Sequence, residues 1–491
     1  MKRNLFGVVA LFAMVCSTFV ACDKTPEPND ETTRNWSEDG GLRAADNLLF
    51  GDTIGNGDDE FVFTGTQTLK KGTYLLRGWV YVADGATLTI EPGTVIRGDK
   101  ETKAALIVER GGKLYAKGTS TEPVVFTSAQ PKGQRRPGDW GGLILCGRAN
   151  NNQTEQQIEG GPRSKHGGND NADCSGALSY VRVEFAGYPF QTDKEINGIT
   201  FGSVGSGTQV DHLQVSYSND DSFEWFGGTV NCRYLVAYHG WDDDFDTDNG
   251  FSGHVQFGLA VRNSRLADVS QSNGFESDNC ADGAAVSPYT TCVFSNITFI
   301  GPKADPQFQN DANYINGGDY YPNNGSSLGR FQAGMQIRRN SRLCCFNSVV
   351  AGWPIGIMID NEKGNSWQAA KDGLLQVQNT WIVDADYLGS DMNKQYKDHL
   401  ALDYKEQTFD ETQPSFSSTY FLGQTGNRQS TSAEAMLSGW MPLSGSPLLN
   451  AASFTASALN GFEPVSYIGA FGSDKDWTEG WTNFDPQNTD Y

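Results

Sequence analysis

The chain is poor in positive charge. It carries 37 lysines and arginines against 59 aspartates and glutamates in 491 residues, a formal net charge of −22. This balance argues against a basic surface of the kind that binds nucleic acid or an anionic membrane, because such binding depends on lysines and arginines that neutralise phosphates. We therefore expect no nucleic-acid ligand, and the acidic surface favours cations.

Familiar metal and catalytic motifs are also missing. No two cysteines have the CxxC spacing of a zinc site, and the five histidines show no spacing of base and nucleophile. After residue 20 no apolar run approaches the length that spans a membrane. The carboxylates remain as the candidates for chemistry.

The first residues have the pattern of an export signal. Lys2 and Arg3 precede an apolar run over residues 5–20, and Cys22 follows directly. This order predicts a lipoprotein signal peptide over residues 1–21, lipidation of Cys22, and a lipidated tether and cap over residues 22–65. An ordinary signal peptide with a cysteine there by chance is the alternative.

Residues 220–249 repeat with an offset of 22. Phe223 recurs as Phe245, and Glu224 recurs as Asp246. A fixed period near 20 residues, with apolar and acidic positions both in register, is typical of a solenoid whose coils stack on one another. Alternating side chains in each strand would place one apolar column inside the stack: Phe223, Phe245, Phe275, Met335 and Ile357.

The same alternation points two further columns outward. The first contains Glu224, Asp246, Glu276, Gln336 and Met358, and the second contains Phe226, Asp248, Asp278, Arg338 and Asp360. Strands in such a stack lie about 4.8 Å apart. At that spacing the acids cannot all ionise without compensation.

Oxygen-rich clusters of this kind select hard cations such as calcium. The sequence therefore predicts calcium as a cofactor, although the spacing is not that of an EF-hand. A solvated acidic face with raised pKa values, or partial neutralisation by Arg338, are alternatives. The predicted metal ligands are Asp220, Asp221, Asp242, Asp243, Asp244, Asp246 and Asp248.

Several motifs carry a resemblance to a known family. Residues 91–96 (EPGTVI), 123–128 (PVVFTS), 138–143 (GDWGGL) and 477–491 resemble segments of the parallel β-helix surface lipoproteins of Bacteroidota. The resemblance implies an all-β, single-stranded, right-handed parallel β-helix and an outer-membrane lipoprotein exposed at the cell surface. It implies no activity.

This fold assignment sets the predicted organisation. We expect a β-helix over residues 66–385 with insertions at 150–177 and 302–328, followed by C-terminal coils and an irregular cap over 386–491. Asn263, Asn296, Asn347 and Asn379 recur in a second strand column and suggest a ladder of amides at a turn.

Three functions are compatible with these features. The first is a non-catalytic binding protein, anchored in the outer membrane, that captures a glycan or nutrient, with an outer-membrane receptor as a possible partner. Aromatic rings beside acids could then stack on sugars. The ligand-binding candidates are Trp225, Phe226, Trp241, Asp248 and Asp278.

The second function is a polysaccharide lyase or glycoside hydrolase that acts on acidic glycans. Two coils, about 9.6 Å from the strand spacing, would place Glu224 and Glu276 near the upper limit for an inverting acid and base pair. A lyase would use Arg338 as its base. The catalytic candidates are Glu224, Asp246, Glu276 and Arg338. The third function is a structural or adhesive surface protein.

Overall fold

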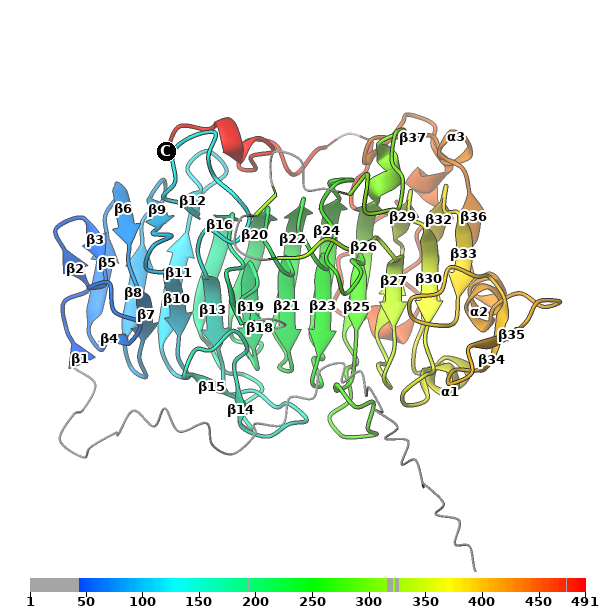
Figure 1. Ribbon diagram of the computed structural model, residues 1–491, viewed down its shortest axis with the longest axis horizontal. Helices are drawn as coiled ribbons and strands as arrows, with labels where there is room; N and C mark the ends of the chain where they lie inside the picture. Colours follow the sequence, from blue (N-terminus) through cyan, green and yellow to red (C-terminus); the bar gives the residue numbers. More distant parts are fainter. Residues whose placement is uncertain (1–43, 192–193, 316–320, 323–325, 474) are drawn as a thin grey trace, which may run out of the picture.

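The computed structural model describes residues 44–491 except 192–193, 316–320, 323–325 and 474. The predicted signal peptide, Cys22 and most of the predicted tether lie outside the described residues. The described chain winds as a parallel β-helix, and its strands succeed one another along the long axis in sequence order (Figure 1).

One sheet receives a single strand from each coil. Its order follows the chain, and every neighbouring pair is parallel, as expected when each coil lies on the one before it. Residues 44–65, expected to lie in a tether and cap, already contribute two of its strands. Its strands are β1 (Ala44–Ala45), β4 (Phe61–Phe63), β7 (Trp79–Val82), β10 (Ala105–Val108), β13 (Gly142–Cys146), β19 (Ile199–Gly202), β21 (Phe223–Phe226), β23 (Phe245–Asp248), β25 (Phe275–Ser277), β27 (Ala333–Ile337), β30 (Ile355–Ile359) and β33 (Tyr387–Ser390).

The second sheet forms the other walls of the tube. In its middle each coil gives one long strand: β16 (Gly176–Glu184), β20 (Gln209–Ser216), β22 (Asn231–Tyr238), β24 (His254–Val261) and β26 (Val293–Ile300). Towards both ends the long strand divides into two short ones. The first row is β5 (Thr66–Leu69), β8 (Thr87–Ile90), β11 (Lys113–Lys117), β28 (Cys344–Phe346) and β31 (Val377–Gln378). The second row is β3 (Thr53–Ile54), β6 (Thr73–Leu76), β9 (Val95–Gly98), β12 (Val124–Ser128), β29 (Val349–Ala351), β32 (Trp381–Val383) and β36 (Arg428–Ser430), with β2 (Leu49–Phe50) antiparallel to β3.

A left-handed residue bends the chain between the two halves of these strands. The column contains Tyr180, His212, Tyr234, Phe257, Asn296, Asn347 and Asn379, all with φ between 49° and 63°. The predicted asparagine column is thus wrong at Asn263, which lies in the turn after β24, while Phe257 holds the corresponding bend. Asparagine tolerates this conformation better than phenylalanine does, so the asparagines mark only part of the column.

The predicted apolar column is confirmed. Phe223 pairs with Phe245 and Phe245 with Phe275 in the strand register, and Met335 and Ile357 continue the series. All five side chains are fully buried. Ring centroids lie 5.7 Å apart between Phe223 and Phe245 and 6.0 Å apart between Phe245 and Phe275. This column fixes which neighbouring residues face outward.

Small elements cover the tube. Helix α2 (Phe416–Gly423) packs on β30 and β33 near the end of the stack. None of the helices in the described part of the chain is long and apolar enough to cross a membrane. The others are α1 (Ser366–Lys371), α3 (Ser432–Ala435), the 3-10 turns Pro302–Ala304, Pro447–Asn450, Ser457–Leu459 and Pro486–Asn488, and the antiparallel pairs β14 (Gln156–Gln157) with β15 (Lys165–His166), β17 (Pro189–Gln191) with β18 (Lys194–Glu195), β34 (Leu400–Asp403) with β35 (Thr408–Asp410), and β37 (Leu437–Ser438) with β38 (Met441–Pro442).

The last segment, residues 436–491, runs back along the outside of the second sheet, and we call it the C-terminal strap (Figure 1). Its described residues contribute no strand to either of the two large sheets. The strap contacts successive coils in reverse order: Ser453 meets Asn347, Tyr467 meets Asn296, Trp477 meets Tyr234, and Trp481 meets His212. It therefore ties together coils that are far apart along the axis.

Candidate functional site

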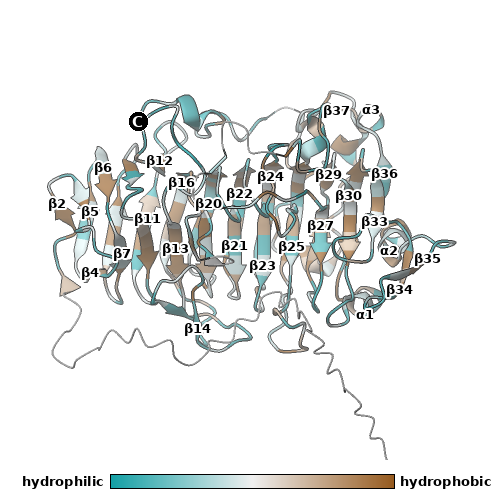
Figure 2. Cartoon of the chain, in the orientation of Figure 1, coloured by the Kyte–Doolittle hydropathy of each residue, from teal (hydrophilic) through white to brown (hydrophobic). Residues whose placement is uncertain are grey.

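The outer face of the first sheet changes character along the axis. Over β7, β10 and β13 it is apolar, and it packs with Ile158 from the insertion after β13 and with Ile196 from the segment between β18 and β19. From β21 onward it becomes acidic. In Figure 2 the strand β23 (FDTD) is coloured largely hydrophilic, whereas β13 (GLILC) is hydrophobic.

The predicted outward column is confirmed in the strand register. Glu224 on β21 pairs with Asp246 on β23, and Asp246 pairs with Glu276 on β25. Gln336 and Met358 continue it on β27 and β30. Three carboxylates therefore stand on three consecutive strands.

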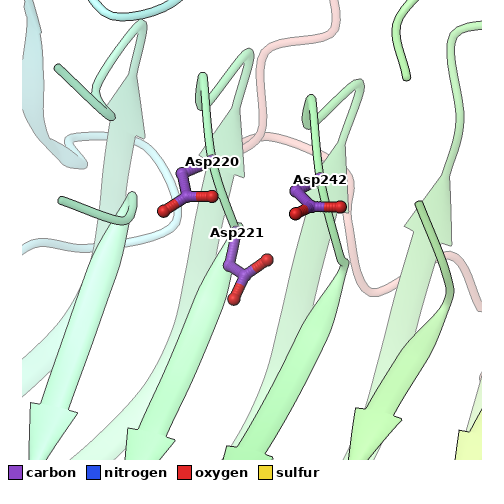
Figure 3. Close-up of side chains that lie close together, drawn as sticks. All are labelled: Asp220, Asp221 and Asp242. Atoms are coloured by element: carbon purple, nitrogen blue, oxygen red, sulfur yellow. The ribbon is translucent and has the colours of Figure 1, made fainter. Parts of the chain in front are cut away.

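A second set of carboxylates comes from the turns that lead into these strands. Asp220 and Asp221 precede β21, and Asp242 takes the place of Asp220 one coil later (Figure 3). One carboxylate oxygen from each of these three lies within 4.8 Å of the others. The same holds for Asp221, Glu224 and Asp246. The two groups share Asp221, and we call their five residues the acidic site.

Burial and mutual repulsion raise the pKa values of the four aspartates of the acidic site. For Asp246, removal from water is the largest cause of the raised pKa, and the carboxylates of Glu224 and Glu276 raise it further. The pKa of Asp220 is also raised, by burial first and then by the negative charges of Glu195 and Glu224. The pKa values of Asp221 and Asp242 are raised for the same reasons. Full ionisation would be costly unless a cation or protons compensate the charge.

Part of this region has a structural role. The Asp221 carboxylate accepts a hydrogen bond from the Asp243 backbone N–H at 2.9 Å, and Asp243 accepts one from the Asn273 N–H. The Asn273 side-chain oxygen in turn accepts the Ala333 N–H at 3.0 Å. Asp221, Asp243 and Asn273 each lie two positions before the first residue of a strand, and each accepts a hydrogen bond from the backbone of the next coil. This ladder fixes the turns that carry the acids.

Two carboxylate oxygens in the acidic site take no part in this ladder of hydrogen bonds. Oδ1 of Asp242 and Oδ1 of Asp246 are buried and have no hydrogen-bond partner. Beside them, the Asn197 amide donates to Glu224, and the Asn197 side-chain oxygen is also buried without a partner. Oxygens of this kind are the ligands that calcium takes. The acidic site therefore fits a hard cation.

Two arginines compensate the acids on β25 and in the turn after it. Arg338 contacts Glu276 and donates to Asp278 at 2.9 Å, and Arg339 donates to the other Asp278 oxygen at 2.7 Å. Burial alone would lower the pKa of Arg338, but Asp278 and Glu276 raise it well above its usual value. Arg338 thus stays cationic, and both oxygens of Asp278 are occupied.

The remaining predicted metal ligands lie outside the two groups. Asp244 forms a fully buried ion pair with Arg262 at 3.0 Å, and burial raises the pKa of Asp244 to about 6. Asp243 belongs to the turn ladder described above. Asp248 accepts the Asn249 backbone N–H at 2.6 Å. The structure therefore brings together Asp220, Asp221, Asp242 and Asp246 and adds Glu224.

The predicted stacking platforms are wrong. Trp225 and Trp241 are fully buried, and Phe226 is 2 % exposed. Trp225 points inward and stacks on Phe201 and Phe251 in the core. No sugar can stack on rings in these positions.

The sequence reasoning missed several members of the surroundings. Asn197 and Asn273 stand two residues before β19 and β25, the same position that Asp221 and Asp243 hold before β21 and β23. That offset was a usable signal. Nothing in the period pointed to Arg262, or to Glu195, which lies on β18 and raises the pKa of Asp220.

A comparison with protein families supports the fold. A family described as "Pectate-lyase like beta helix domain" matches residues 62–441, more than half of the chain. No curated protein sequence matches. A crystal structure of pectate lyase Pel9A is similar, with 14 % sequence identity, a TM-score of 0.35, and coverage of 80 % of this chain and 89 % of that chain.

Proposed function

The chain belongs to the family with a pectate-lyase-like β-helix domain, and on this scaffold we propose that it is a non-catalytic binding protein whose acidic site holds calcium. In this proposal the cation stabilises the acidic face and offers a positive centre to an acidic glycan or nutrient. The observation that carries it is the convergence of Asp221, Glu224 and Asp246 from two consecutive coils, with Asp246 Oδ1 buried and unpartnered.

The surroundings of the site favour binding over catalysis. A lyase needs a base that can lose its proton, and Arg338 is held cationic between Glu276 and Asp278. A hydrolase needs one acid whose pKa is set apart from that of its partner. Here burial and like charge raise the pKa values of Asp220, Asp221, Asp242 and Asp246 together, and none of these aspartates is set apart.

The cellular setting is part of the same proposal. Lipidation at Cys22 would anchor the protein in the outer membrane, and the acidic surface suits exposure at the cell surface. An outer-membrane receptor that accepts the captured ligand would then be the partner.

Calcium binding is tested by calorimetric titration and by the thermal midpoint in calcium against chelator. We expect calcium to raise the midpoint, and Asp246→Asn to remove most of that rise because it takes a ligand charge from the site. Asp248→Asn, two residues along the same strand and outside both groups, is the matched control. Equal midpoints with calcium and with chelator would refute the cation site.

Catalysis is tested on the same protein with uronic-acid and neutral glycans in calcium. Saturable binding without new reducing ends or unsaturated products supports the binding protein. Turnover that Glu224→Gln abolishes would replace this proposal with the enzyme.

A further inference from the structure

A second site lies away from the acidic site, at the carboxyl ends of β7, β10 and β13. A pocket of about 500 Å³ opens there against the β14–β15 hairpin of the insertion. Its lining contains four cationic side chains, Arg110, Arg148, Arg163 and Lys165, and two acidic ones, Asp84 and Glu109. Such a gathering stands out in a chain with a net charge of −22.

Three of the four cationic side chains of the pocket form ion pairs, and one does not. Arg148 pairs with Asp84 at 2.9 Å, Arg163 with Glu109 at 3.0 Å, and Arg110 with Glu155 at 2.8 Å. Lys165 is exposed and forms no ion pair with any described residue. Four cations against three anions suit a ligand that carries a single negative charge.

The donors of the pocket are also in excess. The Arg163 guanidinium carbon lies over the Tyr81 ring, 4.5 Å from its centroid. Arg163 uses Nη2 for Glu109, while its buried Nε has no hydrogen-bond partner. The Arg148–Asp84 pair is exposed, so solvent screens it and an incoming anion can compete for Arg148.

The backbone at Gly111 leaves room for this pair. Gly111 has a φ of +87°, and a Cβ there would lie 2.0 Å from Asp84 Oδ1 and 2.4 Å from an Arg148 nitrogen. Only glycine allows the pair to close over the chain at this point. Any side chain at Gly111 would therefore displace Asp84 or Arg148.

From this charge balance and these donors we propose that the pocket binds a monoanionic group, the carboxylate of a uronic acid or a sulfate half-ester on a sugar. Lys165 and Arg148 supply the attraction, and Arg163 supplies directed hydrogen bonds to the oxyanion. The proposal does not depend on calcium or on the acidic site, so either can fail without the other.

The test is calorimetric titration of the intact protein with glucuronate, glucose 6-sulfate and glucose. We expect saturable binding of at least one anionic sugar, no binding of glucose, and affinity that falls as salt rises. A preference between the two anions identifies carboxylate or sulfate as the recognised group. Absence of binding for both, or equal binding of glucose, would overturn the proposal.

Variants separate recognition from a structural role. Lys165→Ala should weaken binding by about tenfold or more, the size of one charge-assisted contact, and Lys165→Arg should retain most of it. Lys117→Ala, at the exposed end of β11 and outside the pocket, is the matched control. Unchanged affinity in Lys165→Ala would contradict the assignment, and an unchanged thermal midpoint in that variant shows that any loss is not unfolding.

Discussion

At the scale of single residues, a buried carboxylate beside others can avoid repulsion by taking up a proton or by sharing a cation. Asp246 has neither a donor for Oδ1 nor an arginine of its own, whereas Asp244, in the turn just before β23, has Arg262. The two aspartates are separated by one residue in sequence. Their chemistry differs because Asp244 lies in the turn before β23, against Arg262, whereas Asp246 lies on the outer face of the strand itself.

This difference predicts how stability depends on pH. Burial raises the pKa of Asp360 to about 6, and burial with like charge raises the pKa values of Asp220, Asp221 and Asp246. Between an unfolded value of about 4 and these raised values, the folded state binds more protons than the unfolded state. Without calcium, the free energy of unfolding should therefore fall as the pH rises through this window.

Calcium should oppose that fall because it replaces the protons. We expect the difference in thermal midpoint between calcium and chelator to be small near pH 5 and to grow towards pH 8, measured by differential scanning fluorimetry. Asp246→Asn should flatten the pH dependence in chelator. A difference that stays constant across this range would contradict the assignment of the acids to a cation site.

At the scale of strands and turns, the 22-residue offset was enough to predict the coils. Phe223 and Glu224 recur as Phe245 and Asp246 because each coil buries one side chain and exposes the next, so sequence and register coincide. The same reasoning could not place Trp241, which precedes its strand and has no alternation to follow. It also aligned Asn263 with the bends, although Phe257 holds that place.

The bends themselves are set by contacts that local sequence does not reveal. Asn347 has a φ of +50°, and its amide donates to the Ser453 carbonyl while its oxygen accepts the Ser453 N–H at 2.8 Å. Its partner lies 106 residues away. An asparagine in the sequence indicates that a left-handed bend is allowed there. Which groups bind its side chain depends on the path of the strap.

Asn347→Ala should therefore destabilise the protein for two reasons. Alanine adopts the left-handed region less readily than asparagine does, at a cost of up to about 1–2 kcal/mol, and loss of the amide leaves the Ser453 groups without partners, about 1–3 kcal/mol more. Asn347→Gly keeps the backbone conformation and should show mainly the second loss. Urea unfolding of both variants measures the difference, and an alanine variant as stable as the glycine variant would refute the backbone contribution.

At the scale of the whole molecule, a solenoid is held mainly by contacts between neighbouring coils. The strap adds contacts of another kind: Lys132 pairs with Asp490 across 358 residues of sequence, and Tyr491 donates to the buried Glu184 at 2.6 Å. The resemblance of residues 477–491 to a closing segment indicated that this stretch matters. Its reverse path could not be predicted, because nothing in a linear pattern shows which outer surface a segment covers.

Trp481 is the point at which this claim can be tested. It is 1 % exposed, packs edge-on against Tyr180 and His212, and donates its indole N–H to the Trp477 carbonyl at 2.8 Å. We expect Trp481→Ala to cost about 3–5 kcal/mol. Hydrogen exchange should rise first in β16 and β20, which lie beneath it, and least in β30 and β33 at the far end.

Leu443→Ala, in an exposed part of the same strap, is the control and should leave exchange unchanged. If Trp481→Ala raised exchange equally in every coil, the stack would be unfolding as one unit and the strap would add nothing local. A rise confined to β16 and β20 means that the strap stabilises the coils beside the acidic site independently of strand stacking. The turns that carry Asp220 and Asp221 would then depend on both the strap and the stacked strands.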